Sequence, residues 1–444
     1  MLVHSESPMA LQPAGVPFYE PEFGTKITRL VDLADGNHVN WYKAAPEYSN
    51  RQSWNSDQTK LLLVNAGYVI IDAVTGATLA SLNLNAREAK WSPTNPNVIY
   101  YISNYGGAQS KKLYRYTYGA GEVVEKDFSA TYSNLYTGSG KERTNSEMSD
   151  DGTTMALMGL AADGHWEVFT YNVVTGAQSP GLDVYDINVA AGESPASAND
   201  VEWAFMMPSG RYVCVLWMNN GYNFPNGKGI CAYDADTMAY AGHVFGGSSH
   251  CCFTVDEDGN DWLVSDSVTD SSGPLSGGRY VKARVPDGTV YKPDGVTPDW
   301  ARTYYTPSDP HTVILANMSP YGFGRGAPYG WGDHKSGTNY RMHGKKGNWV
   351  LITSDATVPS NFPPENQPYQ IELFRLYLDS TLAAPHVDRL AHYRCSPAAN
   401  YWYYGSISPD GRMAIFGSDW RRGARWVLYG NYAPIEPYIM ELIQ

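Results

Sequence analysis

Four arginines occupy corresponding positions along this chain of 444 residues, each shortly before a tight polar turn that leads into an apolar run. Counting back about six to nine residues from each of seven such turns reaches the expected start of the preceding strand. The positions reached in this way are Arg51, Arg87, Arg143, Asp200, His250, Arg341 and Tyr401. So many planar, permanently charged donors predict a ligand that carries carboxylate or sulfate groups. The alternative is that the arginines pair with nearby acids and tie parts of the fold together: Glu47, Glu88, Glu142 and Glu202.

Histidines are a second candidate set, because four of the ten fall late in the chain in segments that lead towards inner strands: His250, His334, His343 and His392. A metal site built on one strand would need a close spacing such as His-x-His, and the chain has none. The acidic run Asp256–Asp261 lacks the closing Glu of a calcium loop, so we expect a turn there. The sequence therefore predicts no metal and no cofactor.

Aromatic residues gather in Tyr393–Tyr404, a segment that also contains Arg394 and Trp402. Exposed Tyr and Trp beside Arg form surfaces on which sugar rings stack, although core packing explains most tyrosines in a protein of this class. Together with the arginines and histidines this gives the candidate ligand-binding residues Arg51, Arg143, His343, His392, Arg394 and Trp402.

The turns themselves indicate how these residues are positioned. Each is a short polar phrase followed by alternating apolar residues, and the phrase returns every 40 to 60 residues or so, which is typical of a β-propeller. The seven phrases are Trp54–Asp57, Trp91–Asn95, Ser149–Gly152, Pro208–Gly210, Asp256–Gly259, Lys346–Asn348 and Ser408–Gly411. We therefore predict an all-β, seven-bladed propeller of four-stranded antiparallel blades.

The two chain ends are expected to close the ring. Residues 24–30 alternate apolar and polar residues far ahead of the first turn, so we expect this strand to join the last blade, beside Trp426–Tyr429 and Tyr438–Leu442. Residues 1–23 contain four prolines and are predicted to form an extended arm, and 24–444 the propeller, with a long insertion at about 293–340.

Composition excludes several classes of protein. The net charge of −13 disfavours nucleic acid as a partner, and no apolar stretch is long enough to insert into a membrane. The first residues lack the basic and apolar regions of a secretory leader, so the chain is either made in the cytoplasm or has lost a leader before this numbering begins. The five cysteines lack the spacing of a metal site or a redox pair. Cys214 and Cys231 lie on successive predicted strands, so the sequence allows one disulfide between them.

Three stretches carry a resemblance to a known family: Tyr48–Leu63, Trp91–Pro96 and Ser406–Trp420. From about residue 24 to its end the chain resembles the seven-bladed propellers that include the oligogalacturonate lyases and, more distantly, the ulvan lyases. The family's Gln-x-x-His-x-His metal ligands correspond here to Ala399, Trp402 and Tyr404. The resemblance therefore implies a polysaccharide lyase fold without that family's metal site.

A lyase without a metal needs a cation to neutralise the substrate carboxylate, a base for the C5 proton and an acid for the leaving oxygen. Arg341 or Arg51 fits the first role, and His250 and Tyr401 fit the other two. We expect the protein to bind an acidic polysaccharide at its central channel, and the residues leave open whether it also cleaves that polymer.

The rival interpretation is a non-catalytic structural or adhesion propeller of a virion or cell-surface assembly, anchored to a larger protein assembly through residues 1–23. Low charge and high Gly and Tyr content agree with it. On either interpretation we expect an extracellular or virion-associated protein.

Overall fold

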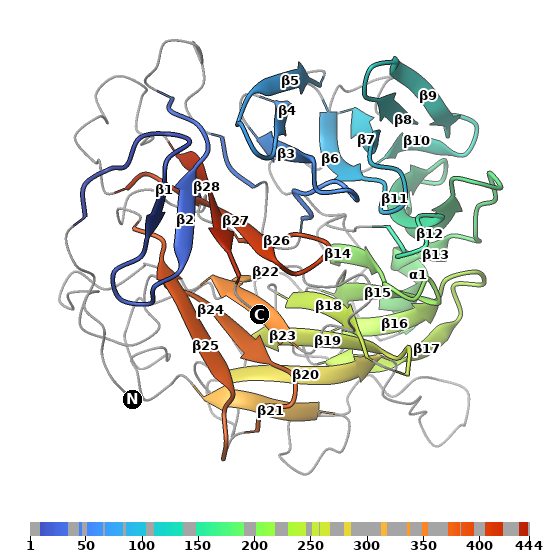
Figure 1. Cartoon of the computed structure of the whole chain (residues 1–444). Coiled ribbons are helices and arrows are strands. Elements are labelled where there is room, and N and C mark those ends of the chain that lie inside the picture. Colours follow the sequence, from blue (N-terminus) through green and yellow to red (C-terminus); the bar gives the residue numbers. More distant parts are fainter. Residues whose placement is uncertain are drawn as a thin grey trace.

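Seven antiparallel sheets follow one another around a ring in the computed structural model (Figure 1). The structure describes residues 9–33, 44–46, 51–64, 67–82, 86–103, 111–135, 148–190, 201–217, 230–245, 251–256, 258–266, 279–285, 312–317, 335–337, 349–353, 372–381, 383–394, 405–420 and 435–442. The chain is a seven-bladed β-propeller, as its turn phrases predict. None of the helices in the described ranges is both long and apolar enough to cross a membrane.

The first three sheets are built from the N-terminal half. The first contains β3 (Lys60–Val64), β4 (Tyr68–Asp72) and β5 (Thr78–Ser81). The second contains β6 (Ala86–Trp91), β7 (Val98–Ser103), β8 (Lys112–Thr117) and β9 (Gly121–Asp127). The third contains β10 (Tyr132–Leu135), β11 (Thr154–Ala161), β12 (Trp166–Asn172) and β13 (Leu182–Asp183), and is followed by α1 (Val184–Ala190).

The next three sheets each have four strands. The fourth sheet contains β14 (Val201–Met206), β15 (Tyr212–Trp217), β16 (Ile230–Asp234) and β17 (Tyr240–Phe245). The fifth contains β18 (Cys251–Val255), β19 (Asp261–Asp266), β20 (Arg279–Val285) and β21 (Thr312–Asn317). The sixth contains β22 (Lys335–Gly337), β23 (Trp349–Thr353), β24 (Glu372–Tyr377) and β25 (Val387–His392). The predicted insertion at 293–340 thus includes β21 and β22, which belong to two successive sheets.

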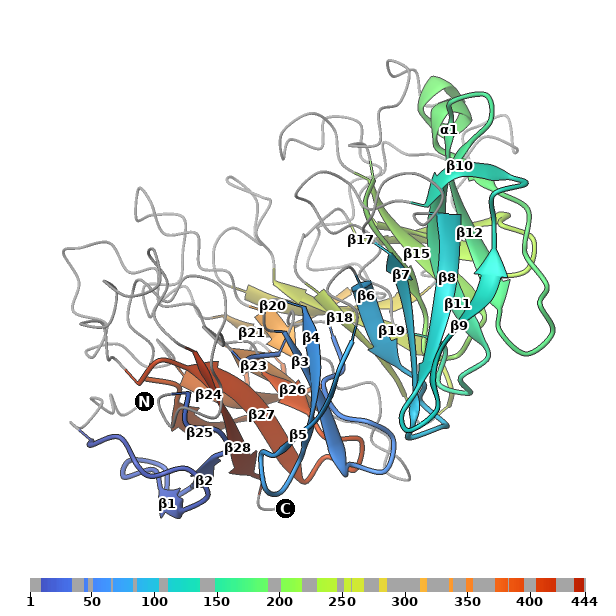
Figure 2. The same cartoon turned by 90° about the horizontal axis from the view of Figure 1, so that it is seen from above.

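The seventh sheet joins the two ends of the chain. Its strand order is β1-β2-β28-β27-β26, formed by β1 (Pro17–Tyr19), β2 (Lys26–Arg29), β26 (Ser406–Ile407), β27 (Met413–Ser418) and β28 (Glu436–Glu441). β2 pairs antiparallel with β28, which confirms that residues 24–30 close the ring. β27 pairs directly with β28, and the predicted strand at 426–429 lies outside the described residues. Figure 2 shows β1 and β2 at the outer side of this sheet.

The strand order of the sheets fixes the centre of the ring, which we call the hub. β14, β18, β22 and β26 lie closest to it, and β17, β21, β25 and β1 lie on the outside (Figure 1). Seven apolar clusters fill the ring, and each lies between two neighbouring sheets. Val64 and Ile70 pack with Ile99 between the first and second sheets, for example, and Leu63 packs with Ile415 between the first and seventh. Because every sheet packs against two others, the apolar core is continuous around the ring.

The repeated turn phrase has a clear structural role. In the third and seventh sheets the Ser hydroxyl donates to the Asp carboxylate two residues later, at 2.6 Å from Ser149 to Asp151 and 2.7 Å from Ser408 to Asp410. The same carboxylates accept the backbone N–H groups of Thr153 and Arg412, respectively. Side chains within each turn therefore stabilise it. Gly follows Asp because its φ is positive, +73° at Gly152.

Tryptophans that begin two of the phrases connect neighbouring sheets. The indole Nε1 of Trp54 donates to the carbonyl oxygen of Ser406 at 3.2 Å, and that of Trp91 donates to Ser53 at 3.0 Å. A buried indole N–H needs an acceptor. Trp54 finds one on β26, the first strand of the seventh sheet, and Trp91 finds one at Ser53, which precedes β3 in the first sheet. This explains why Trp recurs immediately before the turn.

Part of the predicted N-terminal arm packs against the ring. Within its described residues, 9–23, the strand β1 pairs with β2, and Phe18 is buried in the core with Met9 and Leu11 against the same cluster. The arm therefore supplies a fifth strand to the last sheet.

The cysteines in the described ranges, Cys214, Cys231, Cys251 and Cys252, are buried thiols outside any disulfide. Cys214 on β15 pairs in register with Ala232, so Cys231 is offset by one residue. A one-residue offset sends the two thiols to opposite faces of the sheet, Cys214 towards the fifth sheet and Cys231 towards the third. No disulfide joins them.

Candidate functional site

The predicted hub residues are described only in part. Arg143, His250, Arg341, His343, Tyr401 and Trp402 lie outside the described residues. Arg87 is the second residue of β6, the first strand of the second sheet.

Arg51 is described, and its side chain is covered by the protein, with 2 % exposed. It precedes a hydrogen-bond network between the first and seventh sheets. Ser53 N donates to Ser406 Oγ at 3.1 Å, and that hydroxyl donates to Gln52 Oε1 at 3.1 Å. On the other side of Ser406, Gly405 N donates to Thr353 Oγ1 of the sixth sheet at 3.0 Å. Arg51 therefore lies next to the junction of the first and seventh sheets, and the protein covers its side chain.

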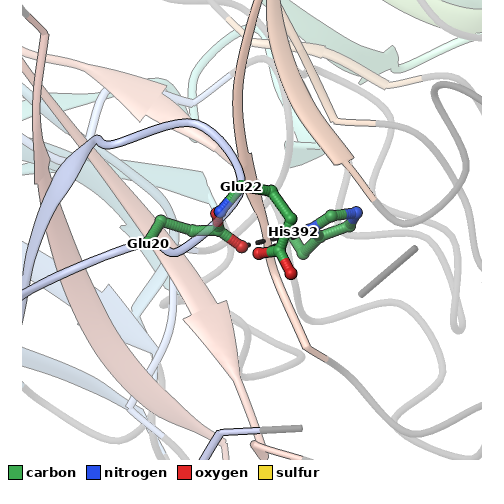
Figure 3. A group of neighbouring side chains, drawn as sticks. All are labelled: Glu20, Glu22 and His392. Carbon is green, nitrogen blue, oxygen red and sulfur yellow. Dashed lines mark hydrogen bonds and ion pairs between the residues drawn. The ribbon is translucent and has the colours of Figure 1, made fainter. Parts of the chain in front are cut away.

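His392 and Arg394 lie far from the hub, at the end of the outer strand β25. There they meet two carboxylates of the N-terminal arm, Glu20 and Glu22, which occupy the turn between β1 and β2 (Figure 3). Glu20 Oε1 accepts from Arg394 Nη2 at 2.9 Å and is 3.0 Å from Nδ1 of His392. Glu22 Oε2 is 3.4 Å from the same Arg394 nitrogen. The arm and the sixth sheet are thus joined by opposite charges.

A second ion pair extends this group into the sixth sheet. Glu372, the first residue of β24, accepts two hydrogen bonds from Arg389 of β25, that from Nε at 2.7 Å. His392 Nε2 is 3.7 Å from Glu372 Oε1, so a carboxylate faces each nitrogen of the imidazole. We call the six residues the charge cluster: Glu20, Glu22, Glu372, Arg389, His392 and Arg394. Glu20 and Glu372 have essentially no exposed side-chain surface.

The charge cluster stabilises the ionised form of Glu20. Burial raises the pKa of this carboxyl, but the hydrogen bond with His392, the hydrogen bonds with Glu22 and the nearby charge of the imidazole outweigh burial and lower the pKa to about 2. Glu20 Oε2 also accepts the backbone N–H groups of Glu22 and Phe23, at 2.7 and 3.1 Å. Both oxygens of Glu20 are therefore engaged.

Glu20, Glu22 and His392 have ligand atoms within 4.8 Å of one another, which is a spacing that a metal ion requires. The Arg394 guanidinium, however, already lies against both carboxylates. Because this cation supplies the charge that a metal would supply, the donor set does not fit a metal site.

Another group of this kind, Asp163, His165 and Asp183, lies on the third sheet. Asp183 Oδ1 accepts the N–H groups of Tyr185 and Asp186 and so caps α1. Its other oxygen is 2.8 Å from His165 Nδ1, and this hydrogen bond is the main reason that the pKa of His165 is raised. Helix capping accounts for this group.

Sequence reasoning found His392 and Arg394 but missed Glu20 and Glu22. The available signal was the phrase Phe18-Tyr19-Glu20-Pro21-Glu22-Phe23, which places two carboxylates between aromatic residues directly ahead of a predicted strand. Nothing in that phrase indicates which part of the ring the carboxylates contact.

Comparison with solved structures finds a protein of the same fold. The oligogalacturonate lyase from Vibrio parahaemolyticus is 12% identical, with a TM-score of 0.58 over 97% of this chain and 97% of that chain. The WD40 domain of Toxoplasma gondii coronin is 9% identical, with a TM-score of 0.43 over 91% of this chain and 84% of that chain. No protein-family model matches, and a search of curated proteins finds no match. At these identities the likeness concerns the fold alone.

Proposed function

We propose that this protein binds an acidic polysaccharide at the hub of its propeller. The observation that carries the proposal is the fold shared with an oligogalacturonate lyase along 97% of both chains. The Tyr48–Leu63, Trp91–Pro96 and Ser406–Trp420 phrases, which carry the resemblance to that family, add support.

The net charge of −13 would repel a polyanion, so binding requires cations concentrated at one place. His392 and Arg394 are engaged by Glu20, and Arg51 is covered. We therefore assign ligand binding to Arg143, Arg341, His343 and Trp402. In this proposal the two guanidinium groups bind the carboxylates of the polymer, and the Trp402 indole stacks on a sugar ring.

Cleavage by β-elimination is a separable second part of the proposal. A base removes the proton at C5 of a uronate, the electron pair forms the C4–C5 double bond, and the C4–O bond to the leaving sugar breaks. The leaving oxygen takes a proton from an acid. Arg341 neutralises the carboxylate and so stabilises the charge that develops at C5, and His250 and Tyr401 act as base and acid. The positions that carry metal ligands in oligogalacturonate lyases hold Ala399, Trp402 and Tyr404 in this chain. These side chains do not offer two good metal ligands, so we assign no step to a metal.

Binding is tested by titrating the protein with de-esterified polygalacturonate and, as a control, with the same polymer fully methyl-esterified. We expect binding only to the charged polymer, and weaker binding by roughly tenfold or more for Arg143→Gln and Arg341→Gln. The matched control is Arg412→Gln, which removes an exposed arginine at a tight turn of the seventh sheet. The proposal is contradicted if the protein binds both polymers equally well. It is also contradicted if the protein binds neither polyuronates nor sulfated polymers.

Cleavage is followed by the ultraviolet absorbance of the unsaturated product. We expect His250→Ala and Tyr401→Phe to abolish product formation while binding persists. Binding without product in the unmodified protein would retain the first part of the proposal and reject the second.

A further inference from the structure

The charge cluster joins two parts of the ring that no strand pairing among the described residues connects. β1 and β2 belong to the seventh sheet, whereas β24 and β25 belong to the sixth. In addition to the cluster, Thr25 Oγ1 donates to the carbonyl of Leu390 on β25 at 2.6 Å. The N-terminal segment therefore crosses the outside of the junction between the last two sheets (Figure 1).

The segment 9–23 is held mainly by side chains. β1 makes only three register pairs with β2, whereas β27 and β28 make six. The other attachments include Phe18 in the core, with Met9 and Leu11 packed against the same cluster, and the two carboxylates in the charge cluster. Three hydrogen bonds add to them: Trp420 Nε1 donates to the Met9 carbonyl at 3.2 Å, Arg29 Nη1 to the Gln12 carbonyl at 3.1 Å, and Gly15 N to the Arg29 carbonyl at 2.8 Å. Val16 and Tyr19 are exposed, so much of the segment faces solvent. Few backbone hydrogen bonds and little buried apolar surface characterise elements that open locally.

The attachment depends on complementary charge. The segment contributes two carboxylates, while the ring contributes Glu372, Arg389 and Arg394, with His392 between them. Removing one partner of such a buried set leaves an uncompensated charge. The free energy of folding lost in this way is far larger than the stabilisation that the complete set provides.

The ring is also strained where the segment attaches. Arg394 and Trp420 have positive φ angles of 50° and 49°, two of the four such non-glycine residues in the described ranges. The Arg394 guanidinium lies 5.4 Å from the Trp420 ring, and Phe18 packs edge-on against that ring at 5.4 Å. Residues held in this conformation cost free energy that the surrounding contacts must offset.

We propose that residues 9–23 form a strap that locks the sixth sheet to the seventh through the charge cluster, and that breaking the cluster releases the strap while the ring stays folded. The strap is thus a conformational element with its own opening equilibrium, and it does not depend on the function proposed for the hub.

Hydrogen–deuterium exchange of the full-length protein tests this, with Glu20→Gln as the variant. We expect the amides of residues 9–23 to exchange faster by about tenfold or more, because one charged hydrogen bond contributes at least that factor. Amides of β27 and β28 open only with the whole ring, so they should still exchange far more slowly than those of residues 9–23. The matched control is Glu441→Gln, which breaks the exposed pair of Glu441 with Lys26, 2.7 Å apart in the same sheet, and should change neither region.

Unchanged exchange in 9–23 would show that the cluster does not hold the strap. Exchange of 9–23 at the same rate as β27 and β28 would show that the strap does not open separately. Either result overturns the proposal. If Glu20→Gln does not fold, Trp420→Phe removes the bond to Met9 and part of the ring that contacts Phe18 and Arg394, and it should raise exchange in 9–23 severalfold. A protease that cleaves after glutamate gives a second readout, because we expect it to cut at Glu22 only when the strap is open.

Discussion

Glu20 and Arg394 are separated by 374 residues in sequence, yet Arg394 Nη2 donates to Glu20 Oε1 at 2.9 Å between the sixth and seventh sheets, where both side chains are buried. The pair connects the segment that precedes the ring-closing strand to the outer end of β25. The ring is therefore closed twice, by backbone pairing of β2 with β28 and by buried charge between neighbouring sheets.

The first prediction concerns acid. The pKa of Glu20 lies at about 2 in the folded protein, below the usual 4.5, so its ionisation stabilises the fold above pH 4.5 and this contribution is lost as the pH falls towards 2. We expect Glu20→Gln to lower the free energy of unfolding by roughly 3 kcal/mol at pH 7 and by less at pH 3. Urea unfolding of both proteins at the two pH values measures this. A difference that grows as the pH falls would contradict it.

The second prediction concerns the pair that anchors β2. Arg29 donates from Nε and Nη2 to the two oxygens of Glu436, at 2.8 and 2.7 Å, and both side chains are buried. Lys cannot make this two-point contact, so Arg29→Lys should cost about 2–3 kcal/mol by urea unfolding.

The control for that measurement is Arg115→Lys. Arg115 pairs with Glu125 at 3.2 Å with 43% of its side chain exposed, so the change should cost less than about 1 kcal/mol. Equal effects of the two substitutions would show that burial of the Arg29 pair is unimportant.

The third prediction concerns contacts between sheets. Trp54→Phe keeps most of the apolar ring but removes the hydrogen bond to the Ser406 carbonyl. We expect a loss of about 1–2 kcal/mol, because a buried carbonyl loses its partner. Trp91→Phe should have an effect of the same size through Ser53. Thermal unfolding of the two variants would contradict the assignment if neither midpoint falls.

The fourth prediction compares two glycines with positive φ, Gly152 at +73° and Gly164 at +89°. A Cβ at Gly152 would lie 2.6 Å from Thr94 Oγ1, whereas a Cβ at Gly164 would meet no atom within 4 Å. Gly164→Ala should therefore cost about 1 kcal/mol from its backbone alone. Gly152→Ala should cost roughly 1 kcal/mol more, because Thr94 must also move. Chemical unfolding would refute this if the two costs are the same.

Much of the fold follows from local patterns. Turn phrases such as Ser408–Gly411 carry their own hydrogen bonds, and the alternation in 24–30 determines which face of that strand is buried. These features involve residues close in sequence, so they can be recognised without knowing the rest of the chain.

Other assignments required the ring itself. Cys214 and Cys231 are on adjacent strands, but a register offset of one residue separates them, and register is a property of the paired sheet. His392 precedes the inner strand β26 in the chain, but only the strand order shows that the residue itself ends the outer strand β25.

The sequence by itself determined the repeating unit, the number of sheets and the strand that closes the ring, because turn chemistry and apolar alternation act over a few residues. Only the tertiary structure decided that Arg394 lies against the carboxylates of Glu20 and Glu22. Such pairing depends on which ends of distant sheets the closed ring brings within a few ångströms, and no local pattern encodes that distance.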